Sequence, residues 1–206
     1  AQGLARLTWD DEVLAMRHAP VQRMGTAQVV PPPGAFLQAT RHGQEVLTQE
    51  VQGTVGDAAR IVDLFAGCGT FALPLAAKAE VHAVEGDSAM IAALDRAWRD
   101  TPNLKRVTSQ ARDLFRRPLL PDELGKVDAV VIDPPRAGAA AQIAELARAQ
   151  VPVIAHVSCN PATFARDAAT LTGAGYSLDF VQPVDQFRWS THVELVGAFR
   201  LSHIAR

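Results

Sequence analysis

The residue with the clearest potential for chemistry is Cys159, in the segment Val-Ser-Cys-Asn-Pro at positions 157–161. An apolar run over 151–157 leads into it and predicts a buried parallel strand, and a helical pattern follows over 163–172. We therefore expect Cys159 where a strand ends and a helix begins, at the sheet edge where open α/β folds bind ligands. The helix N-terminus would favour the thiolate, which is the nucleophilic form. The competing interpretation is a small buried hydrophobic residue without chemistry.

A glycine turn farther upstream has the pattern of a cofactor site. The segment Ala-Gly-Cys-Gly-Thr at 66–70 lies between a strand predicted over 60–65 and a helix predicted over 71–78. Strand, glycine loop and helix form the cofactor-binding half of doubly wound folds, because glycine lets the backbone approach a ligand closely. The next predicted strand, 80–85, ends in Glu85, about 20 residues after the loop, where such folds place a carboxylate on ribose hydroxyls. The alternative for Glu85 is a solvated acid at a strand end.

The same turn lacks two phosphate-binding features. No third glycine and no lysine follow Gly69 at the positions that a pyrophosphate or a P-loop requires. This disfavours a dehydrogenase and favours a cofactor that has a ribose but no phosphate. S-adenosylmethionine is the common cofactor of that kind.

Two more acids follow predicted strands. Asp133 ends an apolar strand over 127–132 and begins the segment Asp-Pro-Pro-Arg. The two prolines fix the backbone and would hold Asp133 rigidly beside the glycine turn, in a pocket suited to a planar base. A purely structural loop is the alternative. Asp113 follows a strand predicted over 104–108, where an acid can reach the adenine end of a cofactor or cap a turn.

The remaining patterns complete the predicted fold. Helices are predicted over 36–55, 88–99 (with Ser88 as N-cap) and 142–150, and the strands 176–184 and 192–201 should form a final antiparallel pair. We expect an α/β, Rossmann-like domain over 34–206, with a mostly parallel seven-stranded sheet and helices on both faces. Residues 1–33 contain a predicted hairpin and end in three prolines. We expect them to be the remnant of a missing upstream domain or an arm that packs on the main fold.

Composition excludes some classes of protein and bounds others. The net charge of −2 over 206 residues gives no support to nucleic-acid binding by charge alone. The two cysteines, Cys68 and Cys159, make neither a disulfide framework nor a metal site, which favours a reducing, cytoplasmic location. No apolar run is long enough for a membrane span and no signal peptide pattern is seen, so no membrane partner is expected. The chain begins Ala-Gln-Gly, and we expect it to be part of a longer protein.

Four motifs together carry a family resemblance: Asp-Leu-Phe-Ala-Gly-Cys-Gly at 63–69, Asp-Pro-Pro-Arg-Ala-Gly at 133–138, Ser-Cys-Asn-Pro at 158–161 and His-Val-Glu at 192–194. In this order they resemble the RNA uracil-5 methyltransferases, which make 5-methyluridine in tRNA and ribosomal RNA. The resemblance covers residues from about 34 to 201. It implies a class I fold dependent on S-adenosylmethionine, with Cys159 as nucleophile in a covalent adduct with uracil and Glu194 as base.

The resemblance also implies binding residues and partners. The implied cofactor-binding residues are Gln38, Phe65, Gly67, Thr70, Glu85, Asp113 and Asp133; Thr70 stands where relatives often have Asn. Relatives usually carry an upstream RNA-binding domain, often OB-like, and some hold an iron-sulfur cluster there through four cysteines. Neither is in this chain, which accounts for its near-neutral charge. We expect tRNA or ribosomal RNA as substrate, a monomer, and no metal.

Two rival functions stay open at this point. Methyltransferases that act on an exocyclic amine have an acid- or Asn-Pro-Pro-aromatic motif, but here Arg136 replaces the aromatic residue and Cys159 would have no role. A non-catalytic binding module is the other rival, although the intact acids and cysteine argue against it. Phe187 and Trp189 are candidates for stacking on RNA or for core packing. Arg136 and Arg166 could contact phosphate, or pair with acids such as Asp167.

Overall fold

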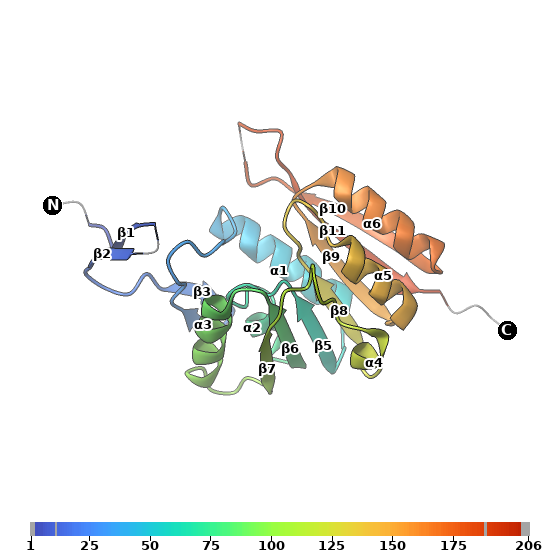
Figure 1. Cartoon of the computed structure of the whole chain (residues 1–206), viewed down its shortest axis with the longest axis horizontal. Coiled ribbons are helices and arrows are strands. Elements are labelled where there is room, and N and C mark those ends of the chain that lie inside the picture. Colours follow the sequence, from blue (N-terminus) through green and yellow to red (C-terminus); the bar gives the residue numbers. More distant parts are fainter. Residues whose placement is uncertain (1–2, 11, 188, 203–206) are drawn as a thin grey trace.

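The computed structural model describes residues 3–10, 12–187 and 189–202. Its centre is a seven-stranded sheet in the order β10-β11-β9-β8-β5-β6-β7 (Figure 1). The parallel strands are β5 (Arg60–Leu64), β6 (Glu80–Glu85), β7 (Val107–Ala111), β8 (Ala129–Ile132) and β9 (Val153–Ser158). β11 (Glu194–Leu201) pairs antiparallel with both β9 and β10 (Tyr176–Val184). The predicted α/β, Rossmann-like fold with its final antiparallel pair is confirmed.

The strand order reverses between β5 and β8. After β5 the chain adds β6 and β7 on one side, and it then returns to add β8 and β9 on the other. Open α/β sheets bind ligands in the crevice at the carboxyl ends of the strands at such a reversal. The glycine turn follows β5 and the Asp-Pro-Pro-Arg segment follows β8, and Asp133 N donates to Leu64 O at 3.2 Å. The topology thus brings these two motifs to the same crevice.

Helices cover both faces of the sheet (Figure 1). α1 (Arg41–Val55), α2 (Ala72–Leu75) and α3 (Ser88–Arg99) contribute to the hydrophobic core on one face. α4 (Pro121–Leu124), α5 (Ala140–Ala149) and α6 (Pro161–Gly173) pack on the other. Crossovers between parallel strands are right-handed, so the reversal of strand order moves the later helices to the opposite face. No helix in the described part of the chain is long and apolar enough to cross a membrane.

Capping residues place two helix starts differently from the prediction. The helix predicted over 36–55 begins at Arg41, because the Thr40 side chain accepts a backbone N–H at 2.9 Å and caps it. The residues before Thr40, Gln38 among them, therefore stay outside the helix. The N-cap of α3 is Asp87 and not the predicted Ser88, because the Asp87 carboxylate accepts hydrogen bonds from the backbone N–H groups of Ala89 and Met90.

Other helices and strands also begin or end at residues that differ from the predicted ones. The strand predicted over 104–108 is wrong in position, because β7 takes its register from β6, where Val81 is opposite Val107. The helix predicted over 71–78 is reduced to the short α2, and the last strand begins at Glu194 and not at His192. Three short elements were not predicted: β3 (Gln22–Met24), β4 (Ala27–Val29) and α4.

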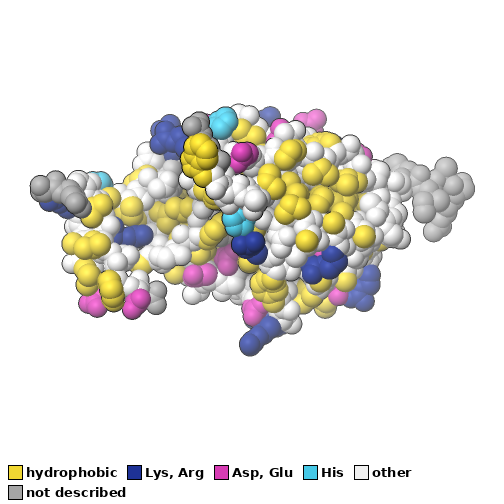
Figure 2. All heavy atoms as spheres, turned by 90° about the horizontal axis from the view of Figure 1, so that it is seen from above, with side chains coloured by type: hydrophobic (Ala, Val, Ile, Leu, Met, Phe, Trp, Pro, Cys, Tyr) yellow, Lys and Arg dark blue, Asp and Glu magenta, His cyan; other side chains and the backbone are white. Residues whose placement is uncertain are grey.

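The N-terminal segment contains two hairpins with different surroundings. β3 and β4 pack against the main body, where Met24 and Val29 are fully buried beside Leu73 and other core residues. The predicted hairpin of β1 (Arg6–Trp9) and β2 (Glu12–Met16) lies farther out (Figure 1). Its apolar side chains are exposed, and Figure 2 shows them gathered at one end of the molecule.

Candidate active site

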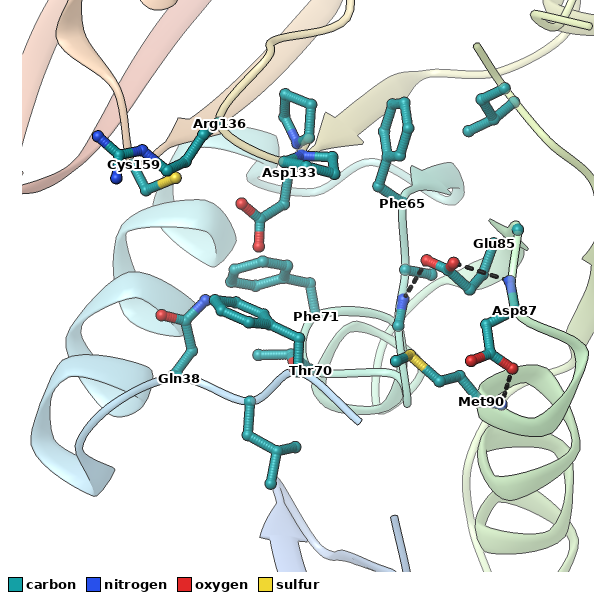
Figure 3. Close-up of a pocket in the computed structure, with 18 of the residues that line it drawn as sticks. Gln38, Phe65, Thr70, Phe71, Glu85, Asp87, Met90, Asp133, Arg136 and Cys159 are labelled. Carbon is teal, nitrogen blue, oxygen red and sulfur yellow. Dashed lines mark hydrogen bonds between the residues drawn. The ribbon is translucent and has the colours of Figure 1, made fainter. Parts of the chain in front are cut away.

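A pocket of about 680 Å³ lies at the carboxyl ends of β5 and β8. Every residue predicted for the site lines it: Gln38, Phe65, Gly67, Thr70, Glu85, Asp113, Asp133, Cys159 and Glu194. Figure 3 shows that they come from two sides, with Cys159, Asp133 and Gln38 on one and Glu85 and Asp87 on the other. The two sides of the pocket thus carry different chemical groups.

Glu85 is held firmly at one end of the pocket. Its carboxylate accepts a hydrogen bond from Gly67 N at 3.1 Å and another from Asp87 N at 2.9 Å (Figure 3). Gly67 has a φ of +55°, a conformation that glycine adopts without strain and that turns its N–H toward the acid. The two bonds fix the glycine turn and the carboxylate relative to each other, so the acid is placed before any ligand arrives.

Two aromatic side chains, Phe65 and Phe115, line the pocket side by side. Phe65 has a φ of +61°, which is strained for a bulky residue, and its strain lies at the first residue after β5. The ring centroids of Phe65 and Phe115 are 5.4 Å apart, with an angle of 57° between the planes. Asp113 accepts backbone N–H groups from Phe115 and Arg116, so it caps the turn that presents Phe115. The turn-cap interpretation of Asp113 therefore holds, although its side chain also borders the pocket.

Cys159 lies where the sequence predicts, in the junction between β9 and α6. The next residue, Asn160, fixes this junction with both atoms of its amide. Asn160 Oδ1 accepts from Ala162 N at 3.0 Å and caps α6, while Asn160 Nδ2 donates to Arg136 O at 3.0 Å. Asn160 thus ties the cysteine segment to the Asp-Pro-Pro-Arg segment.

The β9–β11 pair brings Glu194 to Cys159. Leu195 is opposite Ser158 in this antiparallel pair, so the next position along it sets Glu194 opposite Cys159. Glu194 is only 3% exposed, and burial raises its pKa. A carboxyl group with a raised pKa holds a proton more tightly, which is the property a general base requires.

The pKa of Cys159 shifts in the direction opposite to the one predicted from the sequence. Burial, then Glu194 and then Asp133 raise the pKa of the Cys159 thiol, and its own backbone N–H and Arg136 only partly oppose them. These causes act against the thiolate form that the sequence predicted from the nearby helix N-terminus. Burial and the neighbouring Glu194 also raise the pKa of Asp133 to about 8.

One buried acid and one buried amide escaped the sequence analysis. Asp63 is fully buried under the pocket, and neither carboxyl oxygen has a hydrogen-bond partner among the described residues. Burial, with Asp133 as the next cause, raises the pKa of Asp63 well above its usual range. Gln186 is 8% exposed and bonds to the side chain of Gln38. Asp63 was recognised only as part of a motif and Gln186 was not singled out, so neither had a predicted role.

Arg136 lines the pocket, and the other aromatic and basic candidates differ in their surroundings. Arg136 Nη1 is 3.1 Å from His192 Nε2, and the His192 ring lies 5.6 Å from Phe187. Trp189 is 99% exposed, which excludes the core-packing alternative for this residue. Arg166 makes an ion pair with the buried Asp167 at 2.7 Å, so the structural alternative holds there.

The topology and the pocket at the strand reversal define a Rossmann-like methyltransferase fold. More narrowly, the chain belongs to the tRNA (uracil-5-)-methyltransferase family, whose sequence profile matches residues 33–200. It is 54% identical over 197 residues to an uncharacterized RNA methyltransferase of Mesorhizobium japonicum, covering 96% of this chain and 48% of that protein. It is 39% identical over 178 residues to the 23S rRNA (uracil(1939)-C(5))-methyltransferase of Halomonas elongata, covering 79% of this chain and 35% of that protein.

A solved structure agrees with this family. The tRNA (uracil-54, C5)-methyltransferase of Pyrococcus abyssi, in complex with S-adenosyl-L-homocysteine, matches with a TM-score of 0.75 and 28% identity. The match covers 87% of this chain and 43% of that protein. The chain thus spans about half the length, or less, of these relatives.

Proposed function

We propose that this chain carries the active site of an S-adenosylmethionine-dependent enzyme that methylates carbon 5 of a uridine in tRNA or ribosomal RNA. The observation that carries the proposal is the arrangement of Cys159, just after β9, and Glu194, the first residue of β11, which line one pocket with Glu85. A nucleophile and a base on one side, and a fixed carboxylate on the other, are the groups that this reaction requires.

The residues of the pocket fit S-adenosylmethionine. Two backbone N–H groups hold the Glu85 carboxylate in place. Its oxygens can accept further hydrogen bonds, and these would come from the ribose hydroxyls. The rings of Phe65 and Phe115 offer an apolar wall for adenine, and the acid Asp133 suits the ammonium group of the methionine part. When bound there, the cofactor would supply an electrophilic methyl group.

Cys159 acts first in the proposed reaction. Carbon 5 of uracil is a poor nucleophile, and addition of the thiolate to carbon 6 pushes an electron pair into an enolate that makes carbon 5 nucleophilic. Because its pKa is raised, the thiol must first release its proton, and Cys159 is exposed enough to release it to solvent before this addition. Cys159 then holds the ring through a carbon–sulfur bond while carbon 5 gains the methyl group.

Glu194 completes the proposed reaction. It removes the proton from carbon 5, the electron pair re-forms the double bond between carbons 5 and 6, and the thiolate of Cys159 leaves. The raised pKa of Glu194 makes its carboxylate a stronger base for this step. Burial and Glu194 raise the pKa of Asp133 to about 8, and the ammonium group of a bound cofactor would favour the ionised form of this carboxyl group.

The target uridine has to leave its stack to enter the pocket. We propose that Trp189, which is 99% exposed, stacks on the RNA that surrounds the extruded base. The relatives are at least twice as long as the matched part, and the net charge of this chain is −2. We therefore assign much of the RNA affinity to residues outside this chain, and we place the enzyme in the cytoplasm, where both free cysteines stay reduced.

Nucleoside mass spectrometry tests this proposal directly. In cells that lack the full-length gene, tRNA and ribosomal RNA are digested separately, and 5-methyluridine should disappear from one fraction. Complementation with the wild-type gene should restore it, and complementation with Cys159→Ala should not. Unchanged 5-methyluridine together with loss of a base methylated on its exocyclic amine would overturn the proposal.

A further inference from the structure

Gln186 is a buried amide whose two polar atoms are both engaged. It lies in the loop between β10 and β11, far from α1 in sequence, and is 8% exposed. Its Oε1 accepts a hydrogen bond from Thr40 N at 3.2 Å, and its Nε2 donates to Gln38 Oε1 at 2.9 Å. Gln38 lines the pocket, so Gln186 stands directly behind a pocket residue.

These two hydrogen bonds determine which atom Gln38 turns toward the pocket. The backbone N–H of Thr40 can only donate, so the Gln186 atom that faces it must be the oxygen. The Gln186 group that faces Gln38 is then the NH₂ group, which can only donate. The Gln38 atom that accepts this hydrogen bond must therefore be its side-chain oxygen. The free end of Gln38 is its NH₂ group, and Figure 3 shows the Gln38 nitrogen on the side of the pocket.

The first turn of α1 has a glycine, Gly43, where the Gln186 side chain packs against it. A Cβ atom on Gly43 would come within 2.3 Å of Gln186 Cδ and Oε1, so only glycine leaves room for the amide at this place. Glycine inside a helix is about 1 kcal/mol less favourable than alanine. The helix therefore accepts an unfavourable residue at the position where Gln186 packs.

We propose that Gln186 is a positioning residue that fixes Gln38 as a hydrogen-bond donor to the carboxylate of the cofactor's methionine part. The inference rests on the proposed function. Glu85, the expected partner of the ribose, lies across the pocket from Gln38 (Figure 3), so a cofactor with its ribose at Glu85 extends its amino-acid end toward Gln38. That end has one group that only accepts, the carboxylate, and one that only donates, the ammonium. An NH₂ group can bind only the first of them.

Gln186→Glu tests whether the direction of these two hydrogen bonds determines which end of the Gln38 amide faces the pocket. The introduced carboxylate accepts from Thr40 N and from the Gln38 amide, so it forces Gln38 to turn its oxygen toward the pocket. Calorimetry should show that S-adenosylhomocysteine, which has the carboxylate, binds Gln186→Glu about tenfold or more weakly than wild type. Binding of 5′-methylthioadenosine, which lacks the amino-acid end, should be unchanged.

Gln38→Leu separates the amide orientation from the added charge. With leucine at position 38 there is no amide to reverse, so adding Gln186→Glu to Gln38→Leu should weaken S-adenosylhomocysteine little further. An equal loss with and without the Gln38 amide would mean that the charge of the new glutamate acts directly, and it would overturn the inference.

The remaining outcomes are also decisive. If wild type binds S-adenosylhomocysteine and Gln186→Glu binds it equally well, the inference is wrong while the proposed function stands. An equal loss for both ligands would indicate a general distortion of the pocket and would overturn the inference. Wild type that binds neither ligand would overturn the cofactor assignment itself and the inference with it.

A measurement on the wild-type protein needs no variant of Gln186. The side-chain NH₂ signals of Gln38 in a ¹⁵N–¹H spectrum are assigned by their loss in Gln38→Leu. They should move when S-adenosylhomocysteine is added and stay in place with 5′-methylthioadenosine. Movement with both ligands, or with neither, would overturn the inference even if Gln186→Glu does not fold.

Discussion

Glu194 and Cys159 each lie one position beyond Leu195 and Ser158, the last pair of the β9–β11 ladder, and both line the pocket. They are distant in the sequence, and only the antiparallel return of β11 along β9 brings the acid to the thiol. The acid is, after burial, the largest cause of the raised pKa of Cys159. One strand pairing therefore brings the proposed catalytic pair together and contributes to the raised pKa of the thiol.

Cys159→Ala should abolish methyl transfer and leave cofactor binding intact. The thiol adds to carbon 6 in the proposed reaction, whereas the fixed carboxylate of Glu85 lies on the other side of the pocket (Figure 3). Transfer of labelled methyl groups to RNA should fall below detection, while calorimetry shows an S-adenosylhomocysteine affinity close to that of wild type. Turnover near the wild-type rate would remove Cys159 from the mechanism.

Glu194→Gln should trap the RNA on the enzyme. Without a base the proton stays on carbon 5, so the carbon–sulfur bond to Cys159 persists after methylation. Denaturing electrophoresis should show a band of protein linked to RNA, and adding Cys159→Ala should remove it. Free turnover of Glu194→Gln without the band would place the base elsewhere.

The reactivity of Cys159 toward iodoacetamide should rise with pH, and Glu194→Gln should shift this rise to lower pH. Glu194 raises the pKa of the thiol, so removing its charge leaves more thiolate at neutral pH. Alkylation is followed by mass spectrometry of the Cys159 peptide. Cys68 serves as an internal control, because it is buried and its pKa is about 11. An unchanged pH profile would show that Glu194 does not act on the thiol.

Asp133→Asn should make stability less dependent on pH. Burial and Glu194 raise the Asp133 pKa from 3.8 to about 8, so between these values the folded chain holds a proton that the unfolded chain has released. Its contribution to stability is full below pH 3.8 and is lost as pH rises through about 8. The variant should thus raise Tm more at pH 8 than at pH 5. Glu45→Gln, on the exposed side of α1, is a control for charge removal, and an equal change at both pH values for Asp133→Asn would contradict the prediction.

Gly43→Ala should destabilise the chain although alanine favours helix. The new Cβ would lie 2.3 Å from Gln186, and relieving such a contact costs typically about 1–3 kcal/mol. Gly53→Ala in the same helix is a matched control, because a Cβ there meets nothing within 4 Å and the change should stabilise by about 1 kcal/mol. Urea unfolding measures both. Stabilisation by both substitutions would show that Gln186 does not need the space at Gly43.

The sequence by itself determined the elements and most of the site. Near-continuous apolar runs predicted the buried parallel strands, because a strand covered on both faces has no polar side. Glu85, Asp133 and Cys159 each end or follow such a run, and parallel strands present their carboxyl ends at one edge, so their meeting was predictable. The family resemblance added Gln38 and Glu194 to that list.

Tertiary structure alone decided how these residues are held and charged. Gln186 gave no signal in the sequence, because its burial depends on a loop that folds back onto α1. The direction of the Cys159 pKa shift went against the local prediction, because burial and two carboxyl groups from other segments of the chain raise it. Strand periodicity is a property of neighbouring residues and can be read along the chain. Burial, register and charge coupling are properties of segments that meet only after folding.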